Sequence, residues 1–216
     1  MVSVRGMAAA VVTAVMMVAS GGPAWAGAPT DQLRGRVDRV LGVLEDPALK
    51  QEARAADRQA AIRAIANEIF DFRELSQRTL ARHWQGRTAA ERDEFVRLFA
   101  DLLERSYIGK IETYSGSERI QYLAESVDGD QATVRTKIVT KAGTEIPVDY
   151  RMQRSGDRWL VYDVTIESVS LIANYRAQFN RIIQQSSFKE LLAKLAAKKE
   201  EGLAGEGGSG KSASQR

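Results

Sequence analysis

Residues 119–166 read RIQYLAESVDGDQATVRTKIVTKAGTEIPVDYRMQRSGDRWLVYDVTI, and this stretch decides the fold. It contains four runs in which apolar and polar residues alternate, separated by turn-forming pairs and triplets at 128–129, 142–143 and 155–157. Alternation with a period of two is typical of strands, and Asp-Gly and other glycine-containing steps favour tight hairpin turns. The sequence therefore predicts a four-stranded antiparallel meander with one apolar face.

The segments on either side of this stretch have a helical period instead. Apolar residues recur every three or four positions within 33–44, 62–69, 95–114 and 171–183. Thr88 and Glu91 are spaced as a capping box, which predicts that a long helix opens there, with its apolar stripe over 95–114. We therefore expect an α+β fold in which a helical layer packs on the sheet.

The two ends of the chain differ in composition from the middle. Residues 1–26 combine Arg5, an apolar run over 7–19 and an Ala-x-Ala motif ending at Ala26, which is typical of a secretory signal peptide cleaved after Ala26. Residues 202–216 are mainly Gly, Ser, Lys and Glu without an apolar period, so we expect a disordered tail. One exported domain, 27–201, remains between them.

The composition excludes several kinds of function. With 31 basic and 28 acidic residues the formal net charge is only +3, so no nucleic-acid partner is indicated. The absence of cysteine and the single histidine, His83, exclude a cysteine nucleophile and a multi-histidine metal site. Residues 205–212 match a phosphate-binding loop by letter, but the strand and helix that such a loop needs are missing. We expect no metal and no cofactor.

Large aromatic side chains stand on both expected layers. Tyr122, Tyr150, Met152 and Tyr162 share one face of the predicted sheet, and the long helix carries Phe99, Tyr107 and Tyr114. Such side chains can fill a core or line a cleft for an amphipathic ligand, and composition alone leaves both open. Asp163 falls on the opposite face of its strand, where alternation alone explains a carboxylate.

One segment is similar to a known family. It runs Tyr162-Asp163-Val164-Thr165-Ile166-Glu167-Ser168-Val169-Ser170-Leu171-Ile172 and continues to Asn174-Tyr175-Arg176 and Gln178-Phe179. This resembles the pattern Y-D-x-x-x-E-G-V-S-L/M of the MlaC family of periplasmic lipid-binding proteins, also called toluene-tolerance or ABC-transporter auxiliary proteins. The chain departs from that pattern at Ser168, where the family usually has Gly, and at Ser187, near a second common Gly.

The resemblance implies a strongly curved sheet with a deep apolar pocket for lipid acyl chains. It also implies a periplasmic, monomeric carrier that moves a phospholipid, or a related lipid such as a hopanoid, between membranes. The implied partners are an inner-membrane ABC transporter with its lipid-binding substrate-domain protein and an outer-membrane lipoprotein complex. No catalytic residue is implied. The expected lipid-binding residues, taken from both apolar faces, are Phe99, Leu103, Tyr107, Ile111, Tyr122, Val134, Ile138, Val148, Tyr150, Met152, Tyr162, Val164 and Ile166.

Two other functions remain open at this point. A small-molecule enzyme could be built on a cone-shaped sheet, with Asp163 or a pocket tyrosine as the acid or base. The chain could also be an interaction module whose apolar faces form only a core. The lipid content of the purified protein would distinguish all three.

Overall fold

The computed structural model describes residues 28–114 and 116–197. The predicted signal peptide, 1–26, and the predicted tail, 202–216, lie outside these described residues. The elements before the sheet are α1 (Pro29–Glu45), the short 3₁₀ turn η1 (Glu52–Arg54), α2 (Ala55–Ile69), α3 (Phe72–Leu80), α4 (Arg82–Gln85) and α5 (Ala89–Glu112). The sheet follows with β1 (Arg119–Asp128), β2 (Gln131–Val139), β3 (Glu145–Ser155), β4 (Arg158–Ile166) and β5 (Val169–Ser170). After it come α6 (Leu171–Gln185) and a helix over 188–197.

The predicted meander is confirmed, with one addition. The sheet order is β1-β2-β3-β4-β5 and neighbouring strands are antiparallel throughout. The prediction of four strands misses β5, in which Ser170 and Val169 pair with Thr165 and Ile166. A strand of two residues is too short to show an alternating pattern, so the sequence gives no signal for it.

The long helix begins where the capping box predicts. The side chain of Thr88 accepts a hydrogen bond from the Glu91 backbone N–H, and the Glu91 carboxylate accepts one from the Thr88 backbone. Two backbone donors that the first helical turn leaves free are satisfied in this way. The helix then continues for 24 residues.

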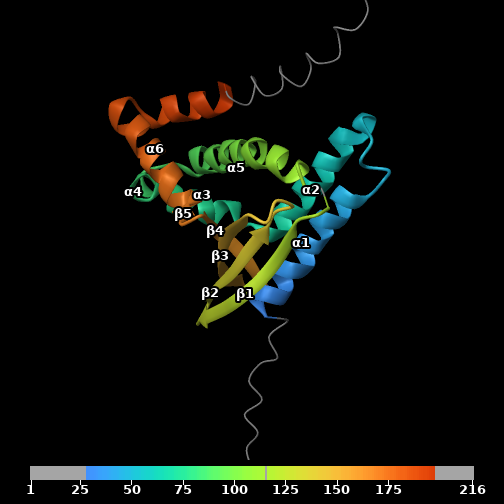
Figure 1. Ribbon diagram of the computed structural model, residues 1–216. Coiled ribbons are helices and arrows are strands. Elements are labelled where there is room, and N and C mark those ends of the chain that lie inside the picture. Colours follow the sequence, from blue (N-terminus) through green and yellow to red (C-terminus); the bar gives the residue numbers. More distant parts are fainter. Residues whose placement is uncertain (1–27, 115, 198–216) are drawn as a thin grey trace, which may run out of the picture.

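Helices pack on both sides of the sheet, but on one side their contacts are mainly with β4 (Figure 1). α1 and α2 pack on one face, here called the inner face, while α3 and α6 pack against β4. α5 crosses the molecule above α3, and its main contacts are with α3 and α2 (Figure 1).

Three groups of buried apolar side chains form the interior. The sheet cluster consists of Leu33, Ile65, Ile69, Ala132, Val134, Val148, Met152, Trp159, Val161 and Val164. The helical cluster consists of Leu75, Leu80, Trp84, Phe95, Leu98, Phe99, Leu102, Leu103, Tyr162, Ile172, Phe179, Phe188, Leu191 and Leu195. A small junction cluster consists of Leu44, Ile62 and Ile108. The layers are therefore held by separate cores.

A bulge in β4 changes which side chains face which core. Asp163 pairs with Arg151 and Val161 pairs with Met152, so Tyr162 is an extra residue without a partner on β3. The extra residue turns Tyr162 away from the inner face and into the helical cluster, where the Arg78 guanidinium lies 4.0 Å from its ring centroid. The prediction that Tyr162 shares a face with Tyr150, Met152 and Val164 is therefore wrong, because simple alternation ignores the bulge.

A second bulge lies at Leu123 of β1, between Tyr122 and Ala124. Beyond it, Glu125 pairs with Val134 and so turns toward the inner face. Its carboxylate accepts a hydrogen bond from the backbone N–H of Thr30 at 2.7 Å. This contact fixes the N-terminus of α1 at the β1 edge of the sheet, where a negative charge complements the helix dipole.

The turn between β4 and β5 is strained. Its two residues, Glu167 and Ser168, have φ values of 48° and 69°. Two central residues with positive φ are what a type I′ hairpin turn requires, and Gly adopts such values at little cost. The departure of Ser168 from the family pattern thus falls on a position where a Cβ is unfavourable.

We expect Ser168→Gly to raise the free energy of unfolding by about 0.5–1 kcal/mol, because it relieves one left-handed residue. The measurement is denaturant unfolding of the purified protein. Ser187→Gly is the matched control. The Ser187 hydroxyl accepts a hydrogen bond from the Glu190 backbone N–H at 3.0 Å, so that change should lower stability by a few tenths of a kcal/mol. A loss of stability in Ser168→Gly would contradict this account of the turn.

Candidate functional site

The expected lipid-binding residues fall into two separate cores. Buried or partly buried in the sheet cluster, or packed against it, are Tyr122, Val134, Ile138, Val148, Tyr150, Met152, Val164 and Ile166. Phe99, Leu103, Tyr107 and Tyr162 belong to the helical cluster or pack against it. Ile111 is 38% exposed.

The two predicted apolar faces therefore do not face each other along their whole length. The ring of Phe99 lies 5.1 Å from those of Tyr175 and Phe179, both on α6. α6 and α3 thus occupy the side of α5 that the sequence assigns to the sheet. The stripe on α5 is correct as a helical face, but its partner is another helix.

The inner face of the sheet is closed at one end and partly open at the other. At the closed end Ala132, Met152 and Val161 form one row across three strands, and all are buried. At the opposite end Ile120, Ile138 and Ile146 pair side by side and remain half-buried. We call these three residues the open row. An apolar row left partly in contact with water is where this face can accept further apolar surface.

The next row mixes buried and half-buried side chains. Tyr122 and Ile166 stand at its two ends and are half-buried, whereas Thr136 and Val148 between them are buried. The Thr136 hydroxyl donates a hydrogen bond to the Val148 carbonyl oxygen at 2.9 Å, so it adds no unpaired polar group to the surface. The centre of this row is therefore effectively apolar.

The end of α5 lies at the same end of the sheet as the open row. Only residues 113–118 separate the last residue of α5 from the first residue of β1, and Ile120 is the second residue of β1. Tyr107 and Ile111, from the last part of α5, are half-buried and exposed respectively. Together with Tyr122, Ile138, Tyr150 and Ile166 on the sheet, these two residues are the expected lipid contacts that retain exposed surface.

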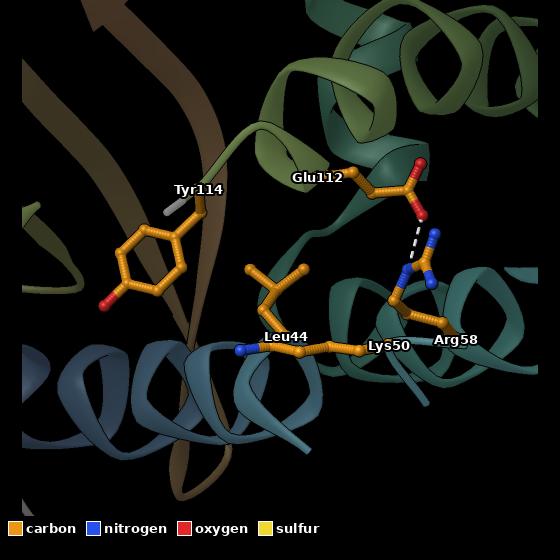
Figure 2. Close-up of a pocket in the computed structure, with 5 residues that line it drawn as sticks. All are labelled: Leu44, Lys50, Arg58, Glu112 and Tyr114. Carbon is orange, nitrogen blue, oxygen red and sulfur yellow. Dashed lines mark hydrogen bonds and ion pairs between the residues drawn. The ribbon is translucent and has the colours of Figure 1, made fainter. Parts of the chain in front are cut away.

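A polar pocket of about 190 Å³ lies where α1, α2 and the end of α5 meet. Figure 2 shows Leu44 between Tyr114 on one side and the Arg58–Glu112 pair on the other, with Lys50 extended along the pocket. Arg58 Nε donates to Glu112 Oε1 at 2.8 Å, and the Tyr114 hydroxyl donates to Glu45 Oε1 at 3.3 Å. The volume is below the roughly 300–1,000 Å³ of typical small-molecule sites, so this pocket does not enclose a two-chain lipid.

A larger depression of about 520 Å³ follows the packing groove of α1 and α2. Its lining includes the small residues Gly42, Ala61 and Ala64. The sequence predicts neither depression. Helix-end charges such as Lys50 and Arg58 have no periodic signal, and the groove depends on how two helices pack.

Two tyrosine hydroxyls lie deep in the sheet layer. Burial raises the pKa of Tyr150 to about 12. Burial also raises the pKa of Tyr122 to about 12, with smaller upward contributions from Tyr150 and Asp38 and an opposing one from Arg34. Both phenols therefore stay neutral under ordinary conditions and act as uncharged polar points in an apolar wall.

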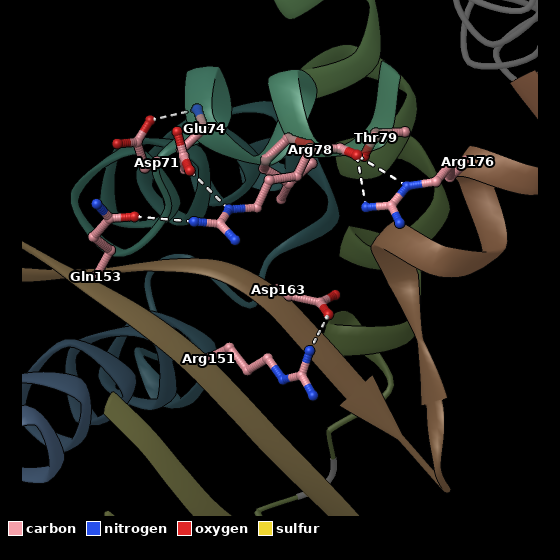
Figure 3. Close-up of polar contacts among 9 residues, drawn as sticks. Asp71, Glu74, Arg78, Thr79, Arg151, Gln153, Asp163 and Arg176 are labelled. Atoms are coloured by element: carbon pink, nitrogen blue, oxygen red, sulfur yellow. Dashed lines mark hydrogen bonds and ion pairs between the residues drawn. The ribbon is translucent and has the colours of Figure 1, made fainter. Parts of the chain in front are cut away.

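Asp163 has a structural role that the alternating sequence pattern does not predict. Its side chain is 3% exposed, although alternation predicts a solvent-facing carboxylate. Asp163 Oδ2 accepts a hydrogen bond from the Ser170 hydroxyl at 2.7 Å, and Oδ1 accepts one from the Ile172 backbone N–H at 3.1 Å. Figure 3 shows Arg151 approaching the same carboxylate, with Nη1 at 4.0 Å from Oδ2. The carboxylate thus anchors the start of α6 to β4.

A further set of contacts joins α3 to its neighbours beside Asp163 (Figure 3). Arg78 Nε donates to Glu74 at 2.7 Å, and Arg78 Nη2 donates to Gln153 of β3 at 3.2 Å. Arg176 of α6 donates two hydrogen bonds to the Arg78 carbonyl oxygen. The polar groups around Asp163 are therefore engaged in holding helices to the sheet.

A metal-ligand cluster and a membrane-spanning helix are both absent from the part of the chain that the structure describes. Within 28–114 and 116–197, no group of three or more His, Asp or Glu side chains is placed to hold a metal ion. In the same residues, no helix has both the length and the apolar character needed to cross a bilayer.

Stability should depend on pH through Tyr150. In the unfolded chain a tyrosine loses its proton near pH 10, whereas folded Tyr150 keeps it until about pH 12. The folded state binds more protons in this window, so the free energy of unfolding falls as pH rises through it, by about 2–3 kcal/mol at most. Urea unfolding across the window measures the slope, which Tyr150→Phe should reduce. Equal slopes in the two proteins would contradict the burial of this hydroxyl.

The family model described as MlaC protein matches residues 34–197. The intermembrane phospholipid transport system binding protein MlaC of Haemophilus influenzae is 23% identical over 139 residues, covering 61% of this chain and 64% of that protein. The chain thus spans slightly less than two thirds of that relative. The toluene tolerance protein ttg2D of Pseudomonas putida is 23% identical over 159 residues, covering 73% of this chain and 74% of that protein.

A solved structure shares the fold. The phospholipid-binding protein from Ralstonia solanacearum, in complex with a phospholipid, superposes with a TM-score of 0.70 at 22% identity. The match covers 82% of this chain and 99% of that one. Because the family model spans helices and sheet alike, from α1 to the helix over 188–197, the chain belongs to the MlaC family.

Proposed function

We propose that the protein is a periplasmic lipid carrier. It shields the acyl chains of a phospholipid, or of a related lipid, while the lipid crosses between the outer and inner membranes. The observation that carries this proposal is the open row, an apolar strip on the inner face of a sheet that is otherwise closed by α1 and α2. The names of the Haemophilus influenzae and Ralstonia solanacearum proteins, which refer to phospholipid, support the choice of ligand.

In this proposal the acyl chains lie against the open end of the inner face. Their first contacts are the expected residues that retain exposed surface, namely Tyr107, Ile111, Tyr122, Ile138, Tyr150 and Ile166. The other expected residues are fully buried and become contacts only as the layers separate around the ligand. They are Phe99, Leu103, Val134, Val148, Met152, Tyr162 and Val164.

The energetics favour a carrier that binds its ligand by apolar contact. Each methylene kept from water contributes about 0.8 kcal/mol, so a two-chain lipid does not cross an aqueous compartment unshielded. A site that bound the lipid much more tightly than the bilayer does would not release it. An apolar face that the protein's own helices cover only in part can shield the acyl chains and still release the lipid. It needs no catalytic group.

The proposed compartment and partners follow from the leader-like residues 1–26 and from the family. We place the carrier in the periplasm, as a monomer that receives and delivers lipid at an inner-membrane ABC transporter with its lipid-binding substrate-domain protein and at an outer-membrane lipoprotein complex. The word intermembrane in the Haemophilus influenzae protein's name supports movement between two membranes. No cofactor is needed for this function.

A charge on the open row should remove bound lipid while the fold persists. We expect Ile138→Glu to lower the lipid that co-purifies at least severalfold, because the carboxylate would have to be desolvated against acyl chains. Since Ile138 is half-buried, its loss should cost the lipid-free protein about 1 kcal/mol or less. Lipid extraction with mass spectrometry gives the lipid-to-protein ratio, and thermal unfolding gives the stability.

The matched control is Gln121→Glu, which adds the same charge on the outer face of the sheet. Gln121 is exposed and lies between Ile120 and Tyr122, so its side chain points away from the inner face. Lipid content should stay at the wild-type value in this variant. A folded Ile138→Glu protein that carries the full complement of lipid would refute the placement of the site.

The alternative of an enzyme using Asp163 is disfavoured by the geometry of that carboxylate. Both oxygens already accept hydrogen bonds, and both donors belong to the start of α6. A residue that works as an acid or base must instead reach a substrate proton. We therefore assign Asp163 to holding α6 on β4.

Asp163→Asn should lower stability and leave lipid binding in place. The amide retains only one acceptor oxygen, so one of the two donors loses its partner, at a cost of about 1–3 kcal/mol. Thermal unfolding and the lipid-to-protein ratio are measured together. Asp149→Asn on the outer face of β3 is the control and should change neither value. Unchanged stability in Asp163→Asn would favour the enzyme. So would an enzymatic turnover that the wild-type protein shows and this variant lacks.

A further inference from the structure

The hydroxyl of Tyr122 is an unsatisfied polar group within the sheet layer. Its oxygen is buried and has no hydrogen-bond partner among the residues that the structure describes. A buried hydroxyl without a partner is disfavoured by about 1–3 kcal/mol, and such groups are rare in native interiors. The position therefore calls for a partner that the protein itself does not provide.

Thr136 and three tyrosines other than Tyr122 have hydroxyl partners within the protein. Thr136, in the same row as Tyr122, donates to the Val148 carbonyl oxygen. Tyr107 and Tyr175 are hydrogen-bonded to each other, and Tyr114 donates to Glu45. Tyr122 differs from these residues because it stands on the edge strand β1, directly beside the bulge at Leu123.

A cation lies over the ring that carries this hydroxyl. The guanidinium of Arg34, from α1, is 4.5 Å from the centroid of the Tyr122 ring. Arg34 is exposed, and no carboxylate among the described residues lies within ion-pair distance of it. Asp38, one helical turn further along α1, is near enough to influence the pKa of Tyr122 but does not accept its proton.

We propose that Tyr122 and Arg34 form a polar subsite for the ester and phosphate groups of an ester-linked phospholipid. The proposal rests on the proposed lipid-carrier function and names the class of its ligand. The Tyr122 hydroxyl donates to an ester carbonyl oxygen at the top of an acyl chain. The Arg34 guanidinium, on the solvent side of the same ring, faces the phosphate.

The chemistry of the two groups selects this region of a lipid. An ester carbonyl is an uncharged acceptor that sits at the border between acyl chains and headgroup, as Tyr122 sits between the apolar sheet face and the exposed Arg34. A guanidinium is well suited to phosphate oxygens. A polycyclic hydrocarbon lipid without an acceptor at this level would leave Tyr122 unpaired, so the subsite distinguishes ester-linked phospholipids from such lipids.

The test compares ester-linked phosphatidylglycerol with its dialkyl ether analogue, which has the same chains and headgroup but no carbonyl oxygens. Delipidated full-length protein is loaded from vesicles of either lipid, and bound lipid is counted by native mass spectrometry. We expect the wild-type protein to retain the ester lipid about three- to tenfold better, the factor that corresponds to one net hydrogen bond. This comparison needs no variant and so does not depend on the folding of one.

Two substitutions test the Tyr122 hydroxyl and the Arg34 guanidinium separately. Tyr122→Phe should abolish the preference for the ester lipid, and its melting temperature without lipid should hold or rise, because no internal hydrogen bond is lost. Arg34→Gln should weaken retention of both lipids by a similar factor, since both carry the phosphate. Tyr175→Phe and Arg158→Gln, which make the same changes in the helical cluster and at the start of β4, should leave the ester preference intact.

The outcomes that overturn the proposal are distinct from failure of the carrier function. Equal retention of ester and ether lipids by the wild-type protein, or a preference that survives Tyr122→Phe, excludes the subsite while leaving a lipid carrier. A lower melting temperature in Tyr122→Phe with the preference retained shows a structural hydroxyl instead. A wild-type protein that takes up neither lipid refutes the proposed function itself.

Discussion

The buried carboxylate of Asp163 is the interaction on which the rest of the structure depends. It lies at the bulge of β4, and its two oxygens accept hydrogen bonds from Ser170 and from the backbone of Ile172. These bonds fix the first turn of α6 against the sheet. α6 then supplies Phe179, whose ring lies 5.8 Å from Phe95 and 5.1 Å from Phe99 of α5. One carboxylate thereby positions α6, and the α5 rings that pack on it, relative to β4.

The same bulge divides the side chains of β4 between the two cores. Before it, Trp159 and Val161 point toward α1 and α2, and after it Val164 takes over that direction. Tyr162 is the residue turned outward, where it joins the helical cluster. α5 thus buries its aromatic stripe against α3 and α6 and has no need of the sheet. The open row is what remains when both layers have satisfied their cores separately.

The sequence predicted the elements well and their mutual arrangement less well. Alternation and glycine turns located β1 to β4, and the Thr88 capping box located the start of α5, because these signals are local. The predicted face of Tyr162 was wrong, since a single inserted residue reverses a period of two and leaves no mark on composition. Asp163 lies on the face that alternation predicts, but the start of α6 covers it there. The site was predictable as a set of apolar residues. Which of them stay exposed depends on how α1, α2 and α6 pack, and the unpaired hydroxyl of Tyr122 depends on its tertiary surroundings, which no local pattern predicts.

Leaving an apolar row uncovered is costly for a domain of ordinary stability. Full burial of an isoleucine is worth about 1.5–3 kcal/mol, and a native domain is stable by only about 5–15 kcal/mol in total. The three residues of the open row therefore withhold an appreciable fraction of the stability that complete packing would give. The fold tolerates this because the helical cluster and the buried rows of the sheet do not depend on it. A ligand that covers the open row recovers that free energy, and its departure returns the protein to a state that is already folded, which is the condition for repeated loading and release.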